Sequence, residues 1–356
     1  MKKVVLLKPD DMPQWDVFVG QHPYGSICHL SSWQDVLKKS FAHIEGHFFA
    51  LLDDETSEIL AGLPVYTVKS RLTGNRLVSA PFANLFDPLI SKPEDMEILL
   101  AHIIELYKKT KSSYIEIRSL LSTPLIKTTR LKSSCMFKHH YLSLNETPDI
   151  VMKKFHRTCV RKNIKNAVKA NLRINIAENK QQLYVFYKLY FRTRKDIGLP
   201  PLPYKFFEAV WDVFCSSAKV IFLIAELNQH PVAGLMVFKF KNRLSAEYLG
   251  WDRSFHALRP TTYIYWEAIK LAVAQGCDVF DFGRTAIHNN GLLAFKRRWG
   301  TEEVDMTDFF YPKEFMHKNS AGNEASWKYQ LVKKSCEWSP DFLFQLIGNF
   351  CYRHMG

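Results

Sequence analysis

Short apolar runs alternate with amphipathic segments over the first 150 residues. Strands are predicted at residues 4–7, 44–52, 59–68, 114–118 and 141–144, and helices at 10–19, 31–37 and 94–109. Either Ser31 or Ser32 can cap the helix that carries Trp33. The polar stretch 53–58 between two strands is typical of a hairpin turn. This alternation predicts one α/β domain over residues 1–150.

The second half of the chain has its own set of elements. Helices are predicted at residues 181–197, 206–215 and 261–274, and strands at 172–176, 220–227, 232–240, 244–249, 279–282 and 304–311. The short joins at 228–230 and 241–243 predict antiparallel hairpins. Because 356 residues exceed one ordinary core, we expect a second domain at 151–315. A helical tail at 316–356 follows, in which Pro340 begins a second segment.

The stretch 278–300 combines an apolar strand with polar residues at its end. The strand is expected to break at Gly283 into a loop over 284–290, and Gly291 to open a short helix with Leu292, Phe295 and Trp299 at helical spacing. Such a loop is where α/β folds usually carry chemistry. Asp281, Arg284, Asn290 and Lys296 are therefore candidate site residues. The alternative is that Asp281 and Arg284 pair to hold the loop, while the cations at 296–298 are solvated.

A cationic block occupies residues 151–173. No acid occurs between Asp149 and Glu178, and the eight cations of the block are Lys153, Lys154, Arg157, Arg161, Lys162, Lys165, Lys169 and Arg173. An apolar stripe of Phe155, Cys159, Ile164, Val168 and Leu172 is expected to pack inward. Together with a net charge of +13, the block favours a partner that bears phosphate, with a solvated basic surface as the alternative.

The element order of the second half is similar to that of a known fold. The order is two helices, three strands, a helix, a strand, a helix and a strand. It resembles the GNAT acyltransferase fold, and more specifically the tandem-GNAT Fem-type transferases. Those enzymes attach amino acids from aminoacyl-tRNA to the peptidoglycan stem peptide. The segments that carry the resemblance are GSICHLSSWQDVLKKSF, SAPFANLFDPLI, RKNIKNAVKANLRI, YKLYFRTRKDIGLPPLPYKFF, RPTTYIYWEAIKLAVAQGCDVFDFGRT and GLLAFKRRWG. It implies an α/β (α+β) protein with two GNAT-like domains in tandem, each a mixed, mostly antiparallel sheet flanked by helices.

One loop departs from acetyl-CoA-binding GNAT domains. Those domains carry a glycine-containing loop before the central helix, and its N–H groups hold the pyrophosphate. Here the corresponding residues read HALRPTT, from His256 to Thr262, without glycine. Arg259 and the helix start at Thr261 can still attract an anion. Fem-type enzymes have similarly lost the loop, so the resemblance favours a donor other than coenzyme A.

The resemblance implies transfer of an acyl or aminoacyl group to an amine. Lys296 would stabilise the oxyanion, and Arg284 would hold a diphosphate or carboxylate. Asp87, at the family's acidic position in the first domain, and Glu247, on a predicted strand, are candidates for the general base. The residues around Asp87 differ from the family's usual Arg-Gly-Pro pattern. Both acids have ordinary turn or salt-bridge roles as alternatives, and a water could take the proton instead.

The implied co-substrate is aminoacyl-tRNA, and no tightly bound cofactor is expected. The expected acceptor is a lipid-linked or nucleotide-linked envelope precursor. One alternative is an acyl-CoA-dependent N-acetyltransferase that acts on an envelope or exopolysaccharide amino sugar. A rival from another class is a basic RNA- or lipid-binding module without chemistry, for which Asp281 and Lys296 would face solvent.

Other sequence patterns bear on metal binding and on the cellular location of the protein. His43 and His47 flank Glu45 on a predicted strand without helical spacing, so no metal site is predicted. Seven scattered cysteines without a C-x-x-C pair indicate reduced thiols and a cytoplasmic protein. An apolar stripe in the tail (Phe342, Leu343, Leu346, Ile347, Phe350 and Cys351) is expected to pack on the second domain. The alternative is peripheral contact with an anionic membrane at its inner face.

Overall fold

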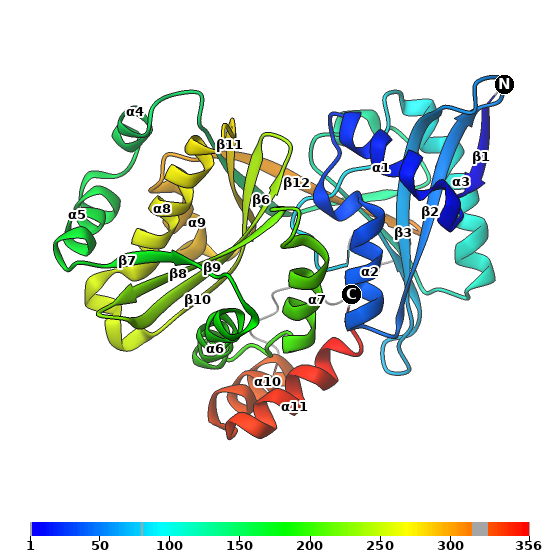
Figure 1. The fold of residues 1–356 in the computed structure, drawn as a ribbon. Helices are drawn as coiled ribbons and strands as arrows, with labels where there is room; N and C mark the ends of the chain where they lie inside the picture. Colours follow the sequence, from blue (N-terminus) through cyan, green and yellow to red (C-terminus); the bar gives the residue numbers. More distant parts are fainter. Residues whose placement is uncertain (1, 80, 315–326, 356) are drawn as a thin grey trace. The chain divides into compact units, whose positions relative to one another are not determined.

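The computed structural model describes residues 2–79, 81–314 and 327–355, and its contacts divide the chain into two compact units (Figure 1). Unit 1 comprises Met1–Lys138, Val304–Ser320 and Tyr352–Gly356, and unit 2 comprises His139–Glu303 and Ala321–Cys351. Each unit is a mixed, mostly antiparallel sheet flanked by helices, as predicted. The units differ from the expected domains because the strand after residue 301 pairs with a strand of unit 1 instead of closing the second domain.

Unit 1 contains most of the elements expected in the first half. Its strands are β1 (Lys2–Leu6), β2 (Ile44–Asp53), β3 (Ile59–Val68), β4 (Arg76–Val78), β5 (Ile115–Ser119) and the greater part of β12 (Glu302–Tyr311), and its main helices are α1 (Met12–Gln21), α2 (Ser31–Ser40) and α3 (Pro93–Lys109). The strands follow the order β1-β2-β3-β4-β5-β12. All neighbours are antiparallel except β4 and β5. The predicted hairpin of β2 and β3 is confirmed.

The core of unit 1 is rich in large aromatic side chains. Trp15 of α1 meets Phe48 of β2 edge to face, with the ring centroids 5.7 Å apart. The Trp15 indole donates to the carbonyl of His29 at 2.7 Å, so its polar atom is satisfied inside the core. The expected serine cap of α2 is wrong: the N-cap residue is Leu30, and the Ser31 hydroxyl donates to Asp16.

Unit 2 contains the elements expected between residues 151 and 300. Its strands are the end of β6 (Lys132–Ser143), β7 (Arg173–Ile176), β8 (Val220–Leu227), β9 (His230–Phe240), β10 (Arg243–Trp251) and β11 (Val279–Ala286), and its helices are α4 (Pro148–Lys153), the π-helical turn η4 (Arg157–Arg161), α5 (Lys162–Lys169), α6 (Lys180–Asp196), α7 (Tyr204–Phe214), the 3-10 helix η5 (Arg253–Leu258), α8 (Pro260–Ala274), α9 (Asn290–Arg297), α10 (Trp327–Trp338) and α11 (Asp341–Tyr352). β7 to β10 are antiparallel neighbours, and β11 pairs with β10 in parallel.

Helices cover both faces of the unit 2 sheet (Figure 1). Side chains of α5 and α8 share one apolar cluster with alternate residues of β8 to β11. On the other face, Phe186 of α6 packs against Phe222 of β8, and Phe207 of α7 packs against Tyr248 of β10. This arrangement buries both faces of the central strands, which explains their nearly continuous apolar sequence.

The inward stripe of the cationic block differs from the predicted one. Val160 and Ala167 are buried, whereas Val168 is 58% exposed and Cys159 is half-buried. The cause is η4, where the Arg161 N–H donates to the carbonyl of His156, five residues earlier. A π-turn accommodates one extra residue, so it rotates the following helix relative to an uninterrupted α-helical pattern.

The tail forms the two predicted helical segments, α10 and α11, with Pro340 just before the second. Residues 316–326 of the expected tail lie outside the described residues. The predicted inward stripe of α11 is wrong at four of its six positions, because Phe342, Leu343, Leu346 and Phe350 are exposed. Ile347 and Cys351 are half-buried, and the buried residues are Phe344 and Gly348.

Candidate functional site

The candidate site of unit 2 is formed where β11 leads into α9. β11 continues through Gly283, whose φ of +71° favours glycine, as far as Ala286. The predicted break at Gly283 is therefore wrong. Asn289 caps α9 by accepting from the Leu292 N–H at 3.1 Å. The inward face of α9 carries Leu293 and Lys296, whereas Leu292 is exposed.

Lys296 is a buried cation held by backbone carbonyls of β11. Its side chain is 3% exposed. The Nζ donates to the carbonyl of Gly283 at 2.8 Å and to that of Arg284 at 3.2 Å, which uses two of its three N–H groups. Burial lowers the pKa of Lys296 to about 8, although Asp281 and Glu247 oppose the shift. The group is therefore mainly protonated at neutral pH, and it changes charge close to the physiological range.

Asp281 of β11 is a buried carboxylate that lies beside the guanidinium of Arg243 and the imidazole of His139. It is 1% exposed, and it accepts from Arg243 Nη1 at 2.8 Å and from the Gly283 N–H at 2.7 Å. His139 Nε2 lies 3.0 Å from one of its oxygens. Burial alone would raise its pKa, but His139, Arg243 and the Gly283 N–H together lower the pKa below its usual value. An ionised Asp281 thus holds Gly283, whose carbonyl in turn holds Lys296.

Glu247 lies on β10 within electrostatic reach of Lys296. The register of β10 against β9 shifts between Ala246 and Tyr248, so Glu247 occupies a β-bulge. Such bulges commonly redirect a side chain. Its charge raises the pKa of both Lys296 and Tyr265. The structure therefore places Glu247, Asp281 and Lys296 in one electrostatic neighbourhood of unit 2.

Arg284 and Asn290 flank this neighbourhood along the chain. Arg284 contributes its backbone carbonyl to Lys296, and its side chain is half-buried. Asn290 is the exposed first residue of α9. The alternative in which Asp281 pairs with Arg284 is wrong, since the carboxylate contacts Arg243 and His139 instead. Residues three apart on a strand point to opposite faces, which separates these two side chains.

Arg259 and Thr261 lie at the start of α8. Arg259 adopts a left-handed conformation with φ of +53°, and its carbonyl accepts from the N–H groups of Thr262 and Tyr263. Pro260 contributes no N–H. In the described part of the chain, neither Arg259 nor Thr261 forms a hydrogen bond to Lys296 or Asp281. This helix start consequently offers few free backbone donors for a diphosphate.

Asp87 belongs to a separate buried network in unit 1. It is 1% exposed, and its Oδ1 accepts from the N–H groups of Leu120 and Ser122 at 2.8 Å each and from the hydroxyls of Ser122 and Ser119. Burial raises the pKa of Asp87 despite these donors. Its side chain thus organises the loop after β5, more than the turn at Pro88 that the sequence suggests.

The sequence analysis missed His139 and Arg243. His139 lies on β6, which begins at Lys132 instead of at the predicted residue 141. Arg243 begins β10, whose parallel pairing aligns Ser245 with Asp281. Arg243 is therefore a diagonal neighbour of Asp281 on one sheet face. Only the register of these distant strands, which no local pattern gives, could have identified the two partners.

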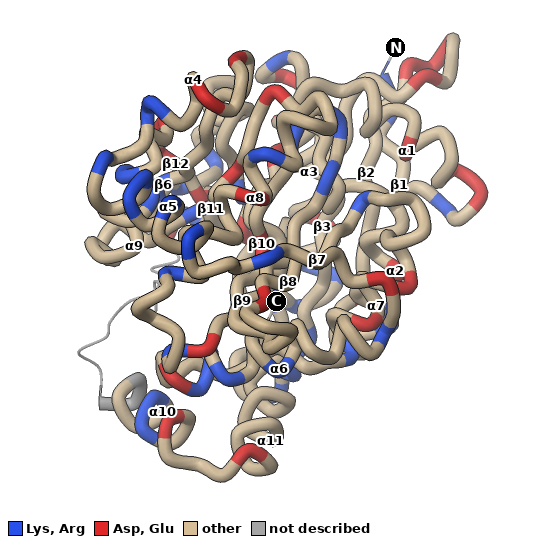
Figure 2. Tube along the Cα trace, turned by 60° about the vertical axis from the view of Figure 1, so that its left-hand side comes forward, with Lys and Arg blue, Asp and Glu red and all other residues tan. Residues whose placement is uncertain are grey.

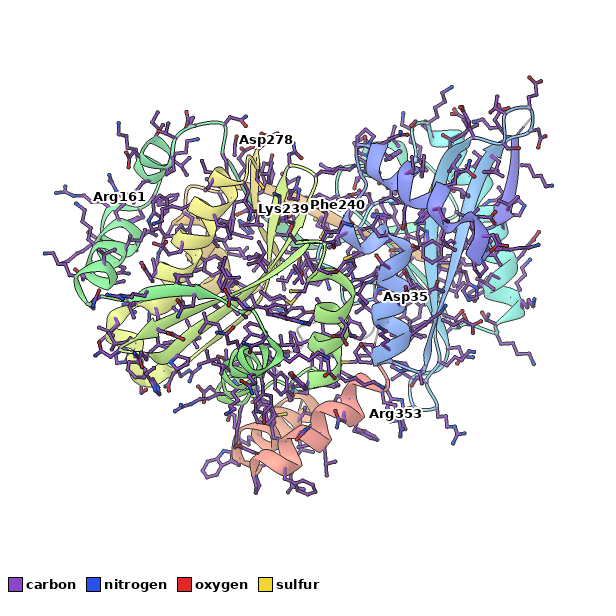
Figure 3. The ribbon with its side chains drawn as sticks, viewed as in Figure 1. Asp35, Arg161, Lys239, Phe240, Asp278 and Arg353 are labelled. Atoms are coloured by element: carbon purple, nitrogen blue, oxygen red, sulfur yellow. The ribbon has the colours of Figure 1, made fainter. Side chains whose placement is uncertain are left out.

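The cationic block forms a positive surface on unit 2. Lys154 pairs with Glu146 at 2.9 Å. In contrast, Lys162, Lys165 and Lys169 are exposed and form no ion pair with any residue that the structure describes. Figure 2 shows the blue positions gathered along α5, and Figure 3 labels Arg161 directly before that helix. The surface can attract an anion.

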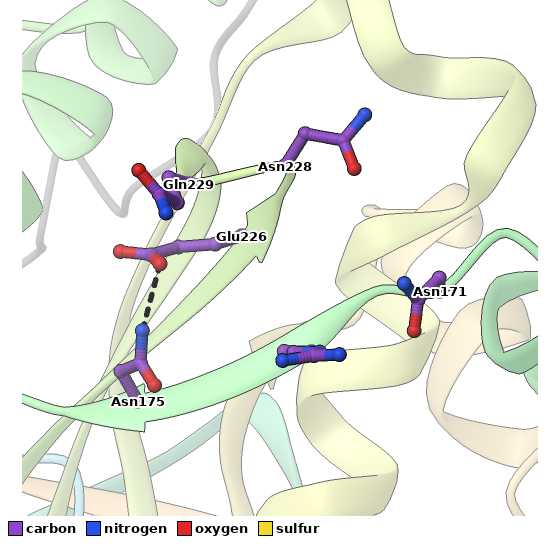
Figure 4. Close-up of a pocket in the computed structure, with 6 residues that line it drawn as sticks. Asn171, Asn175, Glu226, Asn228 and Gln229 are labelled. Carbon is purple, nitrogen blue, oxygen red and sulfur yellow. Dashed lines mark hydrogen bonds between the residues drawn. The ribbon is translucent and has the colours of Figure 1, made fainter.

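A polar cavity of about 350 Å³ lies at the edge strand of unit 2 (Figure 4). It is lined by Asn171, Arg173, Asn175, Glu226, Asn228 and Gln229. Asn175 donates to Glu226 at 2.7 Å. This cavity shares no residue with the group formed by Glu247, Asp281 and Lys296. Its residue Arg173 is the last cation of the cationic block.

The described residues were compared with the requirements of a metal site and of a membrane-spanning helix. Within residues 2–79, 81–314 and 327–355, no three His, Cys, Asp or Glu side chains gather in a group that could hold a metal ion. None of the helices in the described ranges has the length and apolar character needed to cross a bilayer.

A protein-family comparison identifies the domain around these residues. Residues 154–297 match the family model described as acetyltransferase (GNAT) domain. The match includes Glu247, Asp281 and Lys296. No curated protein sequence matches the chain.

Comparison with solved structures concerns the whole chain. A crystal structure of FemX has a TM-score of 0.71 at 15% identity, and the match covers 93% of this chain and 100% of FemX. A tandem GNAT protein from the clavulanic acid biosynthesis pathway has a TM-score of 0.56 at 10% identity, over 89% of this chain and 100% of that one. L-PGS from Bacillus licheniformis has a TM-score of 0.55 at 11% identity, over 96% and 97%. These likenesses establish the fold: two GNAT domains in tandem, as the sequence predicts.

Proposed function

We propose that this chain, whose residues 154–297 match an acetyltransferase (GNAT) domain and which has the tandem fold of FemX, moves an aminoacyl or acyl group onto an amine of a cell-envelope precursor. The carrying observation is the buried Lys296, which two carbonyls of β11 hold beside the ionised Asp281. A buried cation is costly unless it has a partner. Its placement therefore supports a role in stabilising negative charge during transfer.

In the proposed reaction, the acceptor amine attacks the carbonyl carbon of the donor ester or thioester. Negative charge develops on the carbonyl oxygen, and Lys296 stabilises it inside a desolvated site. The nitrogen loses a proton, for which Glu247 is the proposed acceptor, directly or through a water. The tetrahedral intermediate then collapses as the bond between the acyl carbon and the donor oxygen or sulfur breaks, and that atom takes the proton removed from the amine and leaves as a hydroxyl or thiol. Asp281 acts through Gly283 as a positioning residue.

For the donor we favour aminoacyl-tRNA. The glycine-free start of α8, where Arg259 O already accepts two N–H groups, is a poor cradle for the pyrophosphate of coenzyme A. The unpaired cations of α5 suit a polyanion. Arg259 and Thr261, with Arg284 and Asn290, are the proposed contacts for donor or acceptor anions. Acyl-CoA with an envelope or exopolysaccharide amino sugar is the second candidate, which the GNAT family match favours.

For the acceptor we propose a lipid-linked or nucleotide-linked precursor of the peptidoglycan type, encountered at the inner face of the membrane. The likeness to FemX and L-PGS motivates this choice. The rival without chemistry is a binding module, which would leave Asp281 and Lys296 facing solvent. Both side chains are buried, and this favours catalysis.

The test combines calorimetric titration with acetyl-CoA and a transfer assay supplied with charged total tRNA and an amine-bearing precursor, with and without ribonuclease. We expect ribonuclease to abolish transfer and acetyl-CoA to bind weakly. Stoichiometric binding of acetyl-CoA with transfer insensitive to ribonuclease would overturn the choice of donor. No transfer from either donor would overturn the proposed function.

A matched pair of variants separates tRNA binding from general charge effects. Replacement of Lys162, Lys165 and Lys169 by Glu should weaken tRNA binding and flatten its dependence on salt concentration. The control replaces Lys38, Lys39 and Lys108 of unit 1, which are also exposed, and changes the net charge equally. Equal losses in the two variants would show that α5 is only part of a generally basic surface.

A further inference from the structure

The second tail helix, α11, has two unlike faces. Phe344 packs edge to face against Phe191 of α6, with centroids 4.8 Å apart, and a Cβ on Gly348 would lie 2.5 Å from the carbonyl of Pro201. This face therefore anchors the helix closely to unit 2. Phe342 is 69% exposed, and Leu343 and Leu346 are also exposed. Positions 342, 343 and 346 lie on one side of an α-helix, opposite the anchored face.

The preceding helix, α10, adds to the exposed apolar side chains. Leu331 is exposed, and Trp338 is exposed to 85%, more than any other large apolar side chain in the described residues. Lys334 lies three residues after Leu331 and four before Trp338, so all three share one helix face. We call Leu331, Trp338, Phe342, Leu343 and Leu346 the tail surface. Figure 1 draws its two helices in orange and red, beside α6.

The chemistry of the tail surface matches that of a membrane interface. An indole beside a lysine is typical of helices at the boundary between lipid and water, because the ring enters the apolar layer while the ammonium remains at the headgroups. Asp341, the only charged residue of α11, is already paired with Lys195 at 2.5 Å. No unpaired acid of α11 therefore opposes an anionic surface.

Length and charge distinguish a bilayer surface from other partners. The 12 residues of α11 span about 18 Å, whereas the hydrocarbon core is about 30 Å thick. The helix can therefore lie along a membrane but cannot cross it. A second copy of the chain is disfavoured, since two proteins that each carry a net charge of +13 repel one another.

We infer that the tail surface docks this protein on a bilayer that contains anionic phospholipids. α10 and α11 lie in the plane of the headgroups, with Trp338, Phe342 and Leu346 inserted and Lys334 at the phosphate level. The anchored Phe344 and Gly348 transmit this attachment to unit 2. This inference deepens the proposed function, on which its biological purpose rests, because a docked enzyme meets a lipid-linked acceptor in two dimensions.

The test is co-sedimentation of the full chain with vesicles of phosphatidylcholine, alone or mixed with phosphatidylglycerol. The W338Q/F342Q/L346Q variant should lose about tenfold or more in partitioning to the mixed vesicles. Its matched control, V17Q/L72Q/I176Q, changes three exposed apolar side chains elsewhere and should bind like the wild type. K334E, which leaves the apolar surface intact, should weaken binding to mixed vesicles only. Thermal melts verify the fold of every variant.

Several results would overturn the inference. These are a wild type that binds neither vesicle, a triple variant that binds like the wild type, or a control that loses binding equally. Concentration-dependent dimerisation that the triple variant abolishes, without vesicle binding, would assign the surface to a second copy. A transfer assay with a water-soluble acceptor and no vesicles separates the two proposals: the triple variant should retain wild-type rates there. Absence of transfer in the wild type would remove the proposed function and leave docking intact.

Discussion

Two aspartates, Asp281 in unit 2 and Asp87 in unit 1, are equally buried, and yet their pKa values are shifted in opposite directions. Asp281 is surrounded by the guanidinium of Arg243, the ring of His139 and one N–H, and its pKa is lowered. The hydrogen-bond donors to Asp87 are neutral: two N–H groups and two serine hydroxyls. Its pKa is raised. Neutral donors alone do not offset the desolvation of the Asp87 carboxylate, whereas the Arg243 guanidinium together with the His139 ring and one N–H offsets that of Asp281.

The difference indicates different roles. An ionised Asp281 provides the field that keeps a protonated Lys296 inside unit 2. The Oδ1 of Asp87 accepts from four donors that bind the loop after β5 to the segment 81–90, which is a structural role. Glu247, at its bulge near Lys296, is accordingly the better candidate for the base.

The largest expected effect is on stability and follows from breaking the charged network. Asp281→Asn leaves Arg243 and His139 without their anion, which should cost about 3 kcal/mol or more at neutral pH. A carboxyl whose folded pKa is lowered stabilises the fold above its unfolded pKa, and this contribution disappears as pH falls through the folded value. The difference from wild type in urea unfolding should therefore shrink below about pH 4. A constant difference from acid to neutral pH would contradict the assignment.

The next effect is on catalysis. Lys296→Met should lower transfer by about 10²–10³-fold while the protein remains folded. Removal of the buried ammonium relieves a penalty of about 3 kcal/mol, and the two orphaned carbonyls cost about 1–3 kcal/mol each. These terms nearly cancel, so the melting temperature should change little. Turnover and thermal melts on one preparation decide the matter; full activity in a folded variant would remove Lys296 from the mechanism.

A third prediction concerns pH. Since the pKa of Lys296 is about 8, the cation is lost above that pH, and kcat/KM should fall by about tenfold per pH unit in that range. Lys296→Arg keeps the charge at every accessible pH. If Lys296→Arg retains measurable activity, its kcat/KM should no longer fall above about pH 8. Persistence of the limb in Lys296→Arg would assign it to another group.

The smallest expected effect is that of Asp87→Asn. An amide oxygen can accept from the same four donors, so the stability should change by less than about 1 kcal/mol at neutral pH. A carboxyl whose folded pKa is raised stabilises the fold at low pH, and this contribution is lost as pH rises. The variant should thus gain on the wild type as pH rises above about 4. Urea unfolding across this pH range provides the measurement.

The same pair of acids can be compared in the transfer assay. Asp87→Asn should retain transfer to within about tenfold, whereas Glu247→Gln should lose about 10²–10⁴-fold. The reverse order of losses would return the role of base to Asp87, the acid that the family resemblance suggests. Equal retention in both variants would favour a water as the proton acceptor.

Much of the fold could be predicted because the elements that matter are strongly periodic. β2, β3, β8, β9 and α3 agree with prediction to within a few residues, and the segment around Lys296 was identified as the candidate site. The errors fall where a local interruption changes the phase. Because of the π-turn η4, Val160 and Ala167 are buried in place of the predicted Cys159 and Val168. The strand β11 continues through Gly283, because one residue with positive φ does not end a strand.

The sequence alone determined that the chain contains two sets of alternating strands and helices, that a lysine follows the apolar strand of the second set, and that one segment is wholly cationic. Those properties depend on residue type and spacing. The tertiary structure decided that Asp281 takes Arg243 and His139, that Lys296 points inward, and that α11 buries Phe344 while Phe342 faces solvent. Charge partners and exposure depend on contacts between distant segments, and desolvation, which sets the pKa of both Lys296 and Asp87, is a property of everything packed around a group.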